Sequence, residues 1–257
     1  MPPMRSRAFT LLELLVVIAV IAVLTAIISP SLQKSKDSAK SVLCKNNLRQ
    51  LGQALVTYAD TNGSYPQGAD PFNLAAPPGK IQTDASKEHQ GWWWFHYIAE
   101  EHLQNDENEA KGPLWCPDRN VLGTRLKKNI LCGNYGINYS ISKVYSSSQP
   151  TEFKGLPLKP NQIRSASTTM ILMDSGYALI SWKALQDDAA ITPFEVPRRQ
   201  DSFFLPGYAV NKQRTINEDQ QDDALDGRHA GKSVNVLFVD GHVDEKNVSE
   251  MDGGWTP

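Results

Sequence analysis

An apolar segment near the N-terminus restricts the fold more than any other feature of this 257-residue chain. The segment is twenty residues long, from Phe9 to Ile28, and Glu13 is its only charged residue. As a helix it extends about 30 Å, which matches the hydrocarbon core of a bilayer. Arg5 and Arg7 precede it, as is typical of a membrane helix whose N-terminus stays in the cytoplasm.

Three interpretations of this segment compete. The first is a plain membrane anchor, in which Glu13 reaches the interface from one turn inside the helix. The second is a secretory signal that is cleaved after Ala26, since Val23 and Ala26 are a permissible pair of small residues. The third keeps the segment in the mature protein and uses it for assembly. A carboxylate inside a membrane helix costs up to about 3 kcal/mol, and a plain anchor or signal gains nothing from it.

Cleavage just before Phe9 would give the carboxylate of Glu13 an electrostatic partner. The new α-amino group would lie four residues away along the chain. Opposite charges attract strongly in a medium of low dielectric constant, most of all between neighbouring chains that bury both groups. The sequence therefore favours a chain that is first cleaved and then assembled.

The stretch AFTLLELLVVIAVIAVL resembles the prepilin-type cleavage and methylation segment of type IV pilins and type II secretion pseudopilins. The resemblance implies that prepilin peptidase cuts between Ala8 and Phe9 and that Phe9 is then methylated. It also implies that Glu13 pairs with the terminal amine of an adjacent subunit, and that Pro30 bends the helix. The family usually has glycine before the cut. Alanine is the next smallest residue, so we expect cleavage at Ala8, with lower efficiency.

A helical pattern continues beyond the apolar segment. Asn62-Gly63 followed by Pro66 is a helix stop signal. We therefore expect one helix from about Phe9 to about Asp60, bent near Pro30. A secretory signal would not continue into an amphipathic helix in this way. The apolar residues at roughly helical spacing, which we expect to face the body, are Ala39, Leu43, Leu48, Leu51, Leu55 and Tyr58.

The rest of the chain predicts a mixed body. STTMILMDSGYALISW and KSVNVLFVDGHVDEK are typical of strands, and Asp240-Gly241 in the second predicts a two-residue hairpin turn. GWWWFHYIAEEHL predicts a short helix, and residues 186–226 predict long polar loops. The tryptophans of the short helix are expected in the core or at a helix-docking surface, with a ligand surface as the alternative. The expected fold is α+β and pilin-like, with a long bent N-terminal helix packed on a C-terminal antiparallel β-sheet. The expected divisions are a basic leader (1–8), a transmembrane and assembly helix (9–29), an amphipathic half-helix (30–62) and an extracytoplasmic globular domain (63–257).

The three cysteines, Cys44, Cys116 and Cys132, show no CxxC pair of the zinc type. If the body lies outside the cytoplasm, a disulfide is expected. Cys116 can pair with Cys132, or with Cys44 on the helix, which leaves Cys132 free. Three unpaired buried thiols are the remaining option, and the sequence does not separate the three.

The C-terminal stretch DGRHAGKSVNVLFVDGHVDE gathers His229, His242 and several carboxylates, which invites a metal-hydrolase interpretation. The spacing argues against it, because no HExxH pattern, GxSxG elbow or phosphate loop is present. A structural use is simpler: Asp240 caps the turn, and His229 bonds nearby backbone. The stretch also resembles a processing-associated motif of prepilin-like proteins, in which nine residues separate a histidine from Asp-Gly. Here ten separate His229 from Asp240 and Gly241.

We therefore predict a non-enzymatic pseudopilin-like subunit, with no catalytic residue, no metal ligand and no cofactor. Its expected partners are prepilin peptidase, the membrane and other pilin or pseudopilin subunits. The formal net charge of −2 gives no sign of a nucleic-acid partner. The expected location is the bacterial cytoplasmic membrane, crossed once, with the N-terminus inside and the body outside. The alternative is a membrane-tethered extracytoplasmic metal-binding or hydrolytic domain that uses Asp226, His229, Asp240 and His242.

Overall fold

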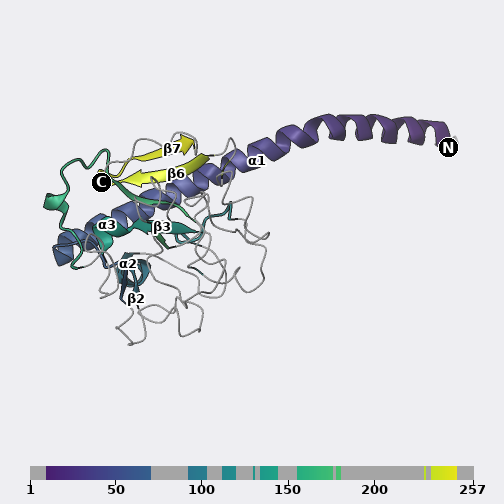
Figure 1. Cartoon of the computed structure of the whole chain (residues 1–257). Helices are drawn as coiled ribbons and strands as arrows, with labels where there is room; N and C mark the ends of the chain where they lie inside the picture. The colour runs from purple at the N-terminus through teal and green to yellow at the C-terminus, as the bar shows by residue number, and fades with distance from the viewer. Residues whose placement is uncertain are drawn as a thin grey trace, which may run out of the picture.

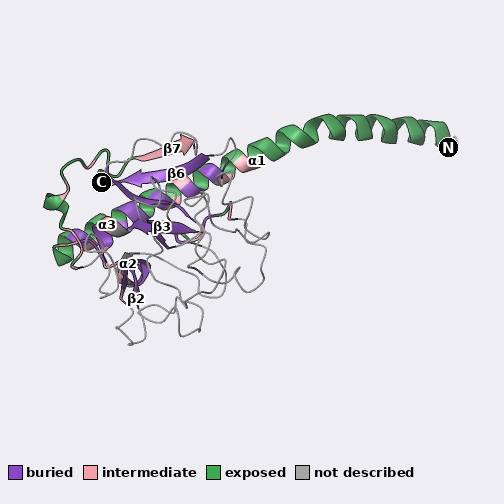
Figure 2. Cartoon of the chain, viewed as in Figure 1, coloured by how far each residue is buried: buried purple, intermediate pink, exposed green. Residues whose placement is uncertain are grey.

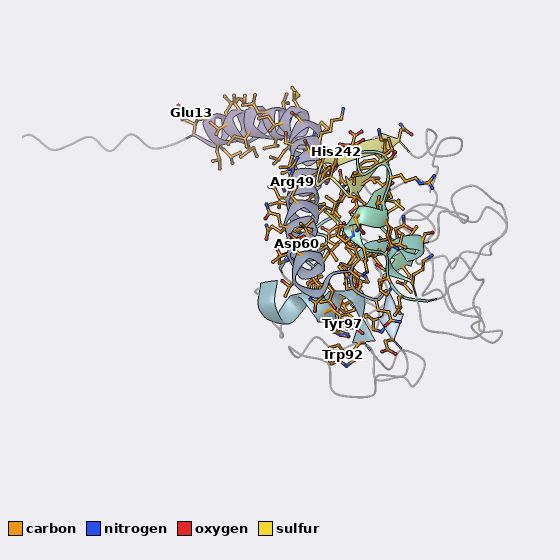
Figure 3. The ribbon with its side chains drawn as sticks, turned by 90° about the vertical axis from the view of Figure 1, so that its left-hand side faces the viewer. Glu13, Arg49, Asp60, Trp92, Tyr97 and His242 are labelled. Carbon is orange, nitrogen blue, oxygen red and sulfur yellow. A yellow bond between two sulfur atoms is a disulfide. The ribbon has the colours of Figure 1, made fainter. Side chains whose placement is uncertain are left out.

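The computed structural model describes residues 10–70, 92–102, 112–119, 130, 134–143, 155–175, 178–180, 229 and 233–247. Helix α1 runs from Leu11 to Asn62 and carries Pro30 in its interior. Its first part, residues 11–36, leaves the body as a long exposed arm. The helix bends between this arm and the half that lies beside the body (Figures 1 and 3). Proline lacks the N–H that an inner helical turn needs, which accounts for a bend at Pro30. Gly63 ends the helix with φ 74°, a left-handed cap that suits glycine.

Among the described residues, helix α1 meets the body in its second half. All residues from 10 to 36 are exposed, and burial begins at Ser41, as the colouring in Figure 2 shows. Leu48, Leu51 and Leu55 are buried as predicted, whereas Ala39 and Leu43 are exposed. The buried stripe reaches the start of the packed half through Ser41 and Cys44 instead of through leucine.

The body is built on a five-stranded sheet in the order β5-β3-β4-β6-β7. The strands are β3 (Tyr135–Asn138), β4 (Met170–Asp174), β5 (Leu179–Ile180), β6 (Ser233–Phe238) and β7 (Val243–Asn247). The predicted sheet is antiparallel, and three of its four pairings are. The pair β3–β5 is parallel, because the chain reverses into β4 and reverses again to return beside β3.

The described residues of the body also form smaller elements. A two-stranded antiparallel ribbon joins β1 (Ala69–Asp70) to β2 (Trp92–Trp93), and α2 (Trp94–His102) follows at once. Single turns of helix are α3 (Tyr139–Ser142) and η4 (Pro160–Gln162). Trp93 and Trp94 are buried in the core, as predicted, whereas Trp92 is partly buried. Trp92 and Trp93 form β2 instead of the start of the predicted helix. The indole N–H of Trp94 donates to the carbonyl of Ala178 at 2.9 Å, which satisfies the polar end of a buried ring.

The core lies between α1, α2 and the sheet, with Leu48, Leu51 and Ile137 among its fully buried side chains. Helix α1 packs across β4, β6 and β7. A Cβ added to Gly52 would lie 2.9 Å from Cδ2 of Leu237, so glycine allows the helix to approach β6 closely. Asn235 shares the face of Leu237, because side chains alternate along a strand. The sheet therefore presents polar as well as apolar side chains to α1.

Candidate functional site

The exposed first half of α1 is the first candidate site. Within the described residues, α1 is long and apolar enough to cross a membrane, and none of its most apolar stretch is buried in the body. A core helix of a soluble protein would bury this stretch, whereas a signal sequence would not. The arm thus offers an unbroken apolar surface, rigidly continuous with the half-helix that packs on the sheet (Figure 1).

Glu13 lies near the free end of this arm (Figure 3). Its Oε2 accepts hydrogen bonds from the backbone N–H of Thr10 at 2.8 Å and from the Thr10 hydroxyl at 2.9 Å. The Thr10 Oγ1 in turn accepts from the N–H of Glu13 at 3.2 Å. This reciprocal pair is a capping box, which satisfies donors that the first turn of a helix leaves open. The carboxylate thus reaches back toward the start of the helix, not sideways along it.

A disulfide joins Cys44 of α1 to Cys116, with Cα atoms 5.4 Å apart. This is one of the pairings that the sequence left open, and Cys132 lies outside the described residues. The two cysteines are 72 residues apart in sequence. A covalent loop of that size stabilises the fold by about 4 kcal/mol in the chain-entropy model. The bond links α1 to the body close to Ser41, where the burial of α1 begins.

The second candidate site is the buried histidine cluster, which consists of His229, Asp118 and Asp174 beside the disulfide. His229 Nδ1 lies 2.9 Å from Asp118 Oδ2, and His229 Nε2 lies 2.8 Å from Asp174 Oδ2. The side chains of His229 and Asp174 are fully buried. Asp174 Oδ2 also accepts the backbone N–H of Asn235 at 2.7 Å. The neighbouring strands β4 and β6 thus fix the position of Asp174, because β4 carries its carboxylate and β6 supplies the N–H that binds it.

The protonation of the cluster follows from its geometry. A neutral imidazole has one donor and one acceptor nitrogen, whereas ionised carboxylates only accept. Because each ring nitrogen faces a carboxylate oxygen, the cluster holds one more proton than a neutral histidine would bring. Lys40 Nζ lies 3.1 Å from Asp118 Oδ1. Lys40, Asp118, His229 and Asp174 together therefore carry no net charge.

Acid should weaken this cluster through Asp118. Burial alone raises the pKa of the Asp118 carboxyl, but hydrogen bonds and positive charge from His229 and Lys40 outweigh burial and lower the pKa below its ordinary value. The unfolded carboxyl, with a pKa of about 3.9, takes up its proton first as the pH falls. The contribution of the Asp118 carboxylate to the free energy of unfolding is therefore complete above pH about 5, and it is lost as the pH falls through the pKa of the folded state.

When the pH falls from about 5 to about 3, we expect the free energy of unfolding of Asp118→Asn to decrease less than that of the wild type. The free energy of unfolding, measured by denaturant titration at each pH, gives both curves. Parallel curves would show that Asp118 does not supply this pH dependence.

The two ends of the His229-to-Asp240 segment lie far apart. His229 pairs with Ser233 at the start of β6, whereas Asp240 and Gly241 form the turn after it. Strand β6 has six residues and so spans about 20 Å. His229, Asp240 and His242 therefore cannot share one metal ion, as the hydrolytic alternative requires. Asp226 lies outside the described residues.

The β6–β7 turn differs in length from the prediction. Gly241 N–H donates to Phe238 C=O, Phe238 N–H donates to His242 C=O, and Gly241 has φ 90°. The loop thus has three residues, with glycine in the left-handed position, because Val239 leaves the ladder along with Asp-Gly. Asp240 Oδ1 accepts the N–H of His242 at 3.1 Å, so Asp240 caps the turn as predicted.

The sequence reasoning missed three residues of these sites. Thr10 had a usable signal, since Thr-x-x-Glu before an apolar run is the capping-box pattern. Asp118 and Asp174 had none, because they lie 111 and 55 residues from His229. His229 was predicted to bond backbone, and its side chain bonds these two carboxylates instead. Ala8 and Phe9 lie outside the described residues.

The similarity of this chain to a known protein family lies in the arm and the residues before it. A family model described as the prokaryotic N-terminal methylation motif matches residues 3–29. The chain carries a prepilin-type N-terminal methylation motif. This confirms the resemblance predicted for that segment, whereas the resemblance around His229 stays a prediction. The methylation motif covers the first part of α1 and ends one residue before Pro30.

Two curated proteins are similar over 62 residues, or 24% of this chain. The type II secretion system core protein G of Pseudomonas aeruginosa is 31% identical, and the match covers 44% of its length. The protein of the same name from Pectobacterium carotovorum subsp. carotovorum is 37% identical, with 40% of its length covered. The chain thus spans less than half of these relatives. No solved structure matches it significantly.

Proposed function

We propose that this chain is a structural, pseudopilin-like subunit, which prepilin peptidase cleaves between Ala8 and Phe9. Phe9 becomes the methylated N-terminus, and α1 carries the subunit into a type II secretion or type IV pilus-like filament. The observation that carries the proposal is the apolar arm, which bears the methylation motif and is fully exposed in the single chain. So large an apolar surface needs lipid before assembly and neighbouring helices afterwards.

The position of Glu13 supports this proposal. Its carboxylate bonds the N–H of Thr10, the residue next to Phe9. A cut before Phe9 therefore creates the new amine close to where the carboxylate already points. In a filament, the arm of a neighbouring chain brings a second such amine to the same low-dielectric surroundings. The attraction between the two charges is then greatest, and it selects the correct stagger between subunits.

The disulfide supports an extracytoplasmic body. Stable disulfides form in oxidising compartments and are rare in the cytoplasm. Basic residues Arg5 and Arg7 precede the arm, which favours a leader on the cytoplasmic side. The chain then crosses the cytoplasmic membrane once, with the peptidase cut inside and the body, including Cys44 and Cys116, outside. Its partners are the peptidase, the membrane and other filament subunits.

Enlarging the residue before the cut should block processing. We expect Ala8→Trp to leave nearly all of the chain as membrane-bound precursor, because a bulky side chain does not fit a site that usually accepts glycine. Ala8→Gly is the matched control and should be cleaved at least as completely as the wild type. Gel mobility and intact mass of the membrane fraction measure the two forms. If Ala8→Trp is cleaved as completely as the wild type, the cut does not lie between Ala8 and Phe9, and this part of the proposal fails.

A further inference from the structure

The disulfide and the buried histidine cluster together form a set of metal-ligand atoms. The sulfurs of Cys44 and Cys116, a carboxylate oxygen of Asp174 and a ring nitrogen of His229 all lie within 4.8 Å of one another. All four residues are buried. They come from α1, the 112–119 segment, β4 and the bridge residue that pairs with the start of β6, so the tertiary fold itself assembles the set. Two sulfurs, one imidazole and one carboxylate are ligands that zinc accepts in a tetrahedral site.

The groups around these ligands are those that a metal site needs. A histidine that binds a metal usually donates its other ring N–H to a carboxylate, which fixes the ring. His229 has this arrangement: Nε2 faces the set, while Nδ1 lies 2.9 Å from Asp118 Oδ2. Asp118 is itself held by Lys40 at 3.1 Å. The backbone N–H of Asn235 orients Asp174 from β6 at 2.7 Å.

We infer that the reduced chain binds one zinc ion through Cys44, Cys116, Asp174 and His229, so that the site holds either a disulfide or a metal. The inference is independent of filament assembly. With bonds of about 2.0–2.3 Å and tetrahedral angles, ligand atoms lie about 3.3–3.8 Å apart. The set spans at most 4.8 Å, and His229 Nε2 and Asp174 Oδ2, now 2.8 Å apart, must separate by about half an ångström.

Reduction followed by zinc binding converts the disulfide form into the metal-bound form. A dithiol reductant transfers two electrons and two protons to the Cys44–Cys116 bond and becomes a disulfide itself. Zinc then replaces three protons, one from each thiol and one from between His229 and Asp174. The thiolates bind as anions and His229 binds as neutral imidazole. Zinc therefore forms the same link between α1 and the body that the disulfide forms in the oxidised chain.

The test uses the full-length chain in mild detergent, reduced with a phosphine under anaerobic conditions and titrated with cobalt(II) and zinc(II). We expect one cobalt per reduced chain, with thiolate-to-cobalt charge-transfer absorption and the intense visible bands of tetrahedral cobalt. Zinc should displace the cobalt, which removes these bands, and should raise the melting temperature of the reduced chain. The oxidised chain should show neither effect. Absence of the thiolate bands in the reduced wild type would overturn the inference.

Variants separate this site from adventitious binding. The double variant Cys44→Ser/Cys116→Ser should lose the charge-transfer absorption, and Asp118→Asn should keep tetrahedral bands while the zinc Kd rises about 10–100-fold. His242→Ala, at the far end of β6, is the matched control and should bind as the wild type does. If the reduced chain unfolds, zinc should restore its near-ultraviolet circular dichroism. Failure to restore it, or charge-transfer bands that survive in Cys44→Ser/Cys116→Ser, would count against the site.

Discussion

Glu13→Val is expected to leave the chain in the membrane and to reduce its incorporation into filaments by more than tenfold. The substitution removes the charge that pairs with the α-amine of a neighbouring subunit. Opposite charges attract most strongly where packed helices exclude water from both groups. Valine is apolar and suits the surrounding segment, so insertion should not suffer. Filaments sheared from cells and the membrane fraction, compared by immunoblot, measure both outcomes.

Glu13→Gln is the control that separates charge from helix capping. The carboxylate also caps the helix at Thr10, and glutamine can occupy the same position of a capping box. This variant keeps the cap and loses the charge. We expect it to assemble as poorly as Glu13→Val. Normal assembly of Glu13→Gln would show that Glu13 acts through the cap, and the pairing hypothesis would then fail.

His229→Ala should destabilise the oxidised body by about 3–5 kcal/mol. Removing one partner of a buried ion pair leaves an uncompensated charge, and here Asp174 is fully buried. The carboxylate of Asp118 retains Lys40 and so suffers less. The free energy of unfolding from denaturant titration, followed by tryptophan fluorescence with the disulfide intact, gives the loss.

His242→Ala is the matched control within the same segment. His242 stacks on Phe238 and bonds Asp240, but 46% of its side chain is exposed. We therefore expect a loss below about 1 kcal/mol. A loss of the same small size for His229→Ala would contradict the charge assignment of the buried histidine cluster.

Local signals in the sequence were sufficient for the long elements. The continuous apolar segment, the helical spacing of Leu48, Leu51 and Leu55 and the Asn62-Gly63 stop each act within a few residues. They predicted α1, and the β-branched runs predicted the strands β4 and β6. The methylation motif was equally local, since charge, leader and apolar segment lie together.

Long-range geometry decided the features that the sequence did not predict. The packed face of α1 turns toward Cys44 and away from Leu43, because the disulfide and the charged cluster lie on that side. The partners of His229 are separated from it by 55 and 111 residues, and no periodicity connects such positions. The His229-to-Asp240 segment looked like one site, but a full strand separates its ends.

The N-terminus of the mature chain tests the central claim most directly. Tandem mass spectrometry of the chain purified from cell membranes should find a first residue at position 9, with one methyl group on the α-amine of Phe9. A chain that still begins at Met1, or one that begins at Ile27 without the apolar arm, would contradict the account.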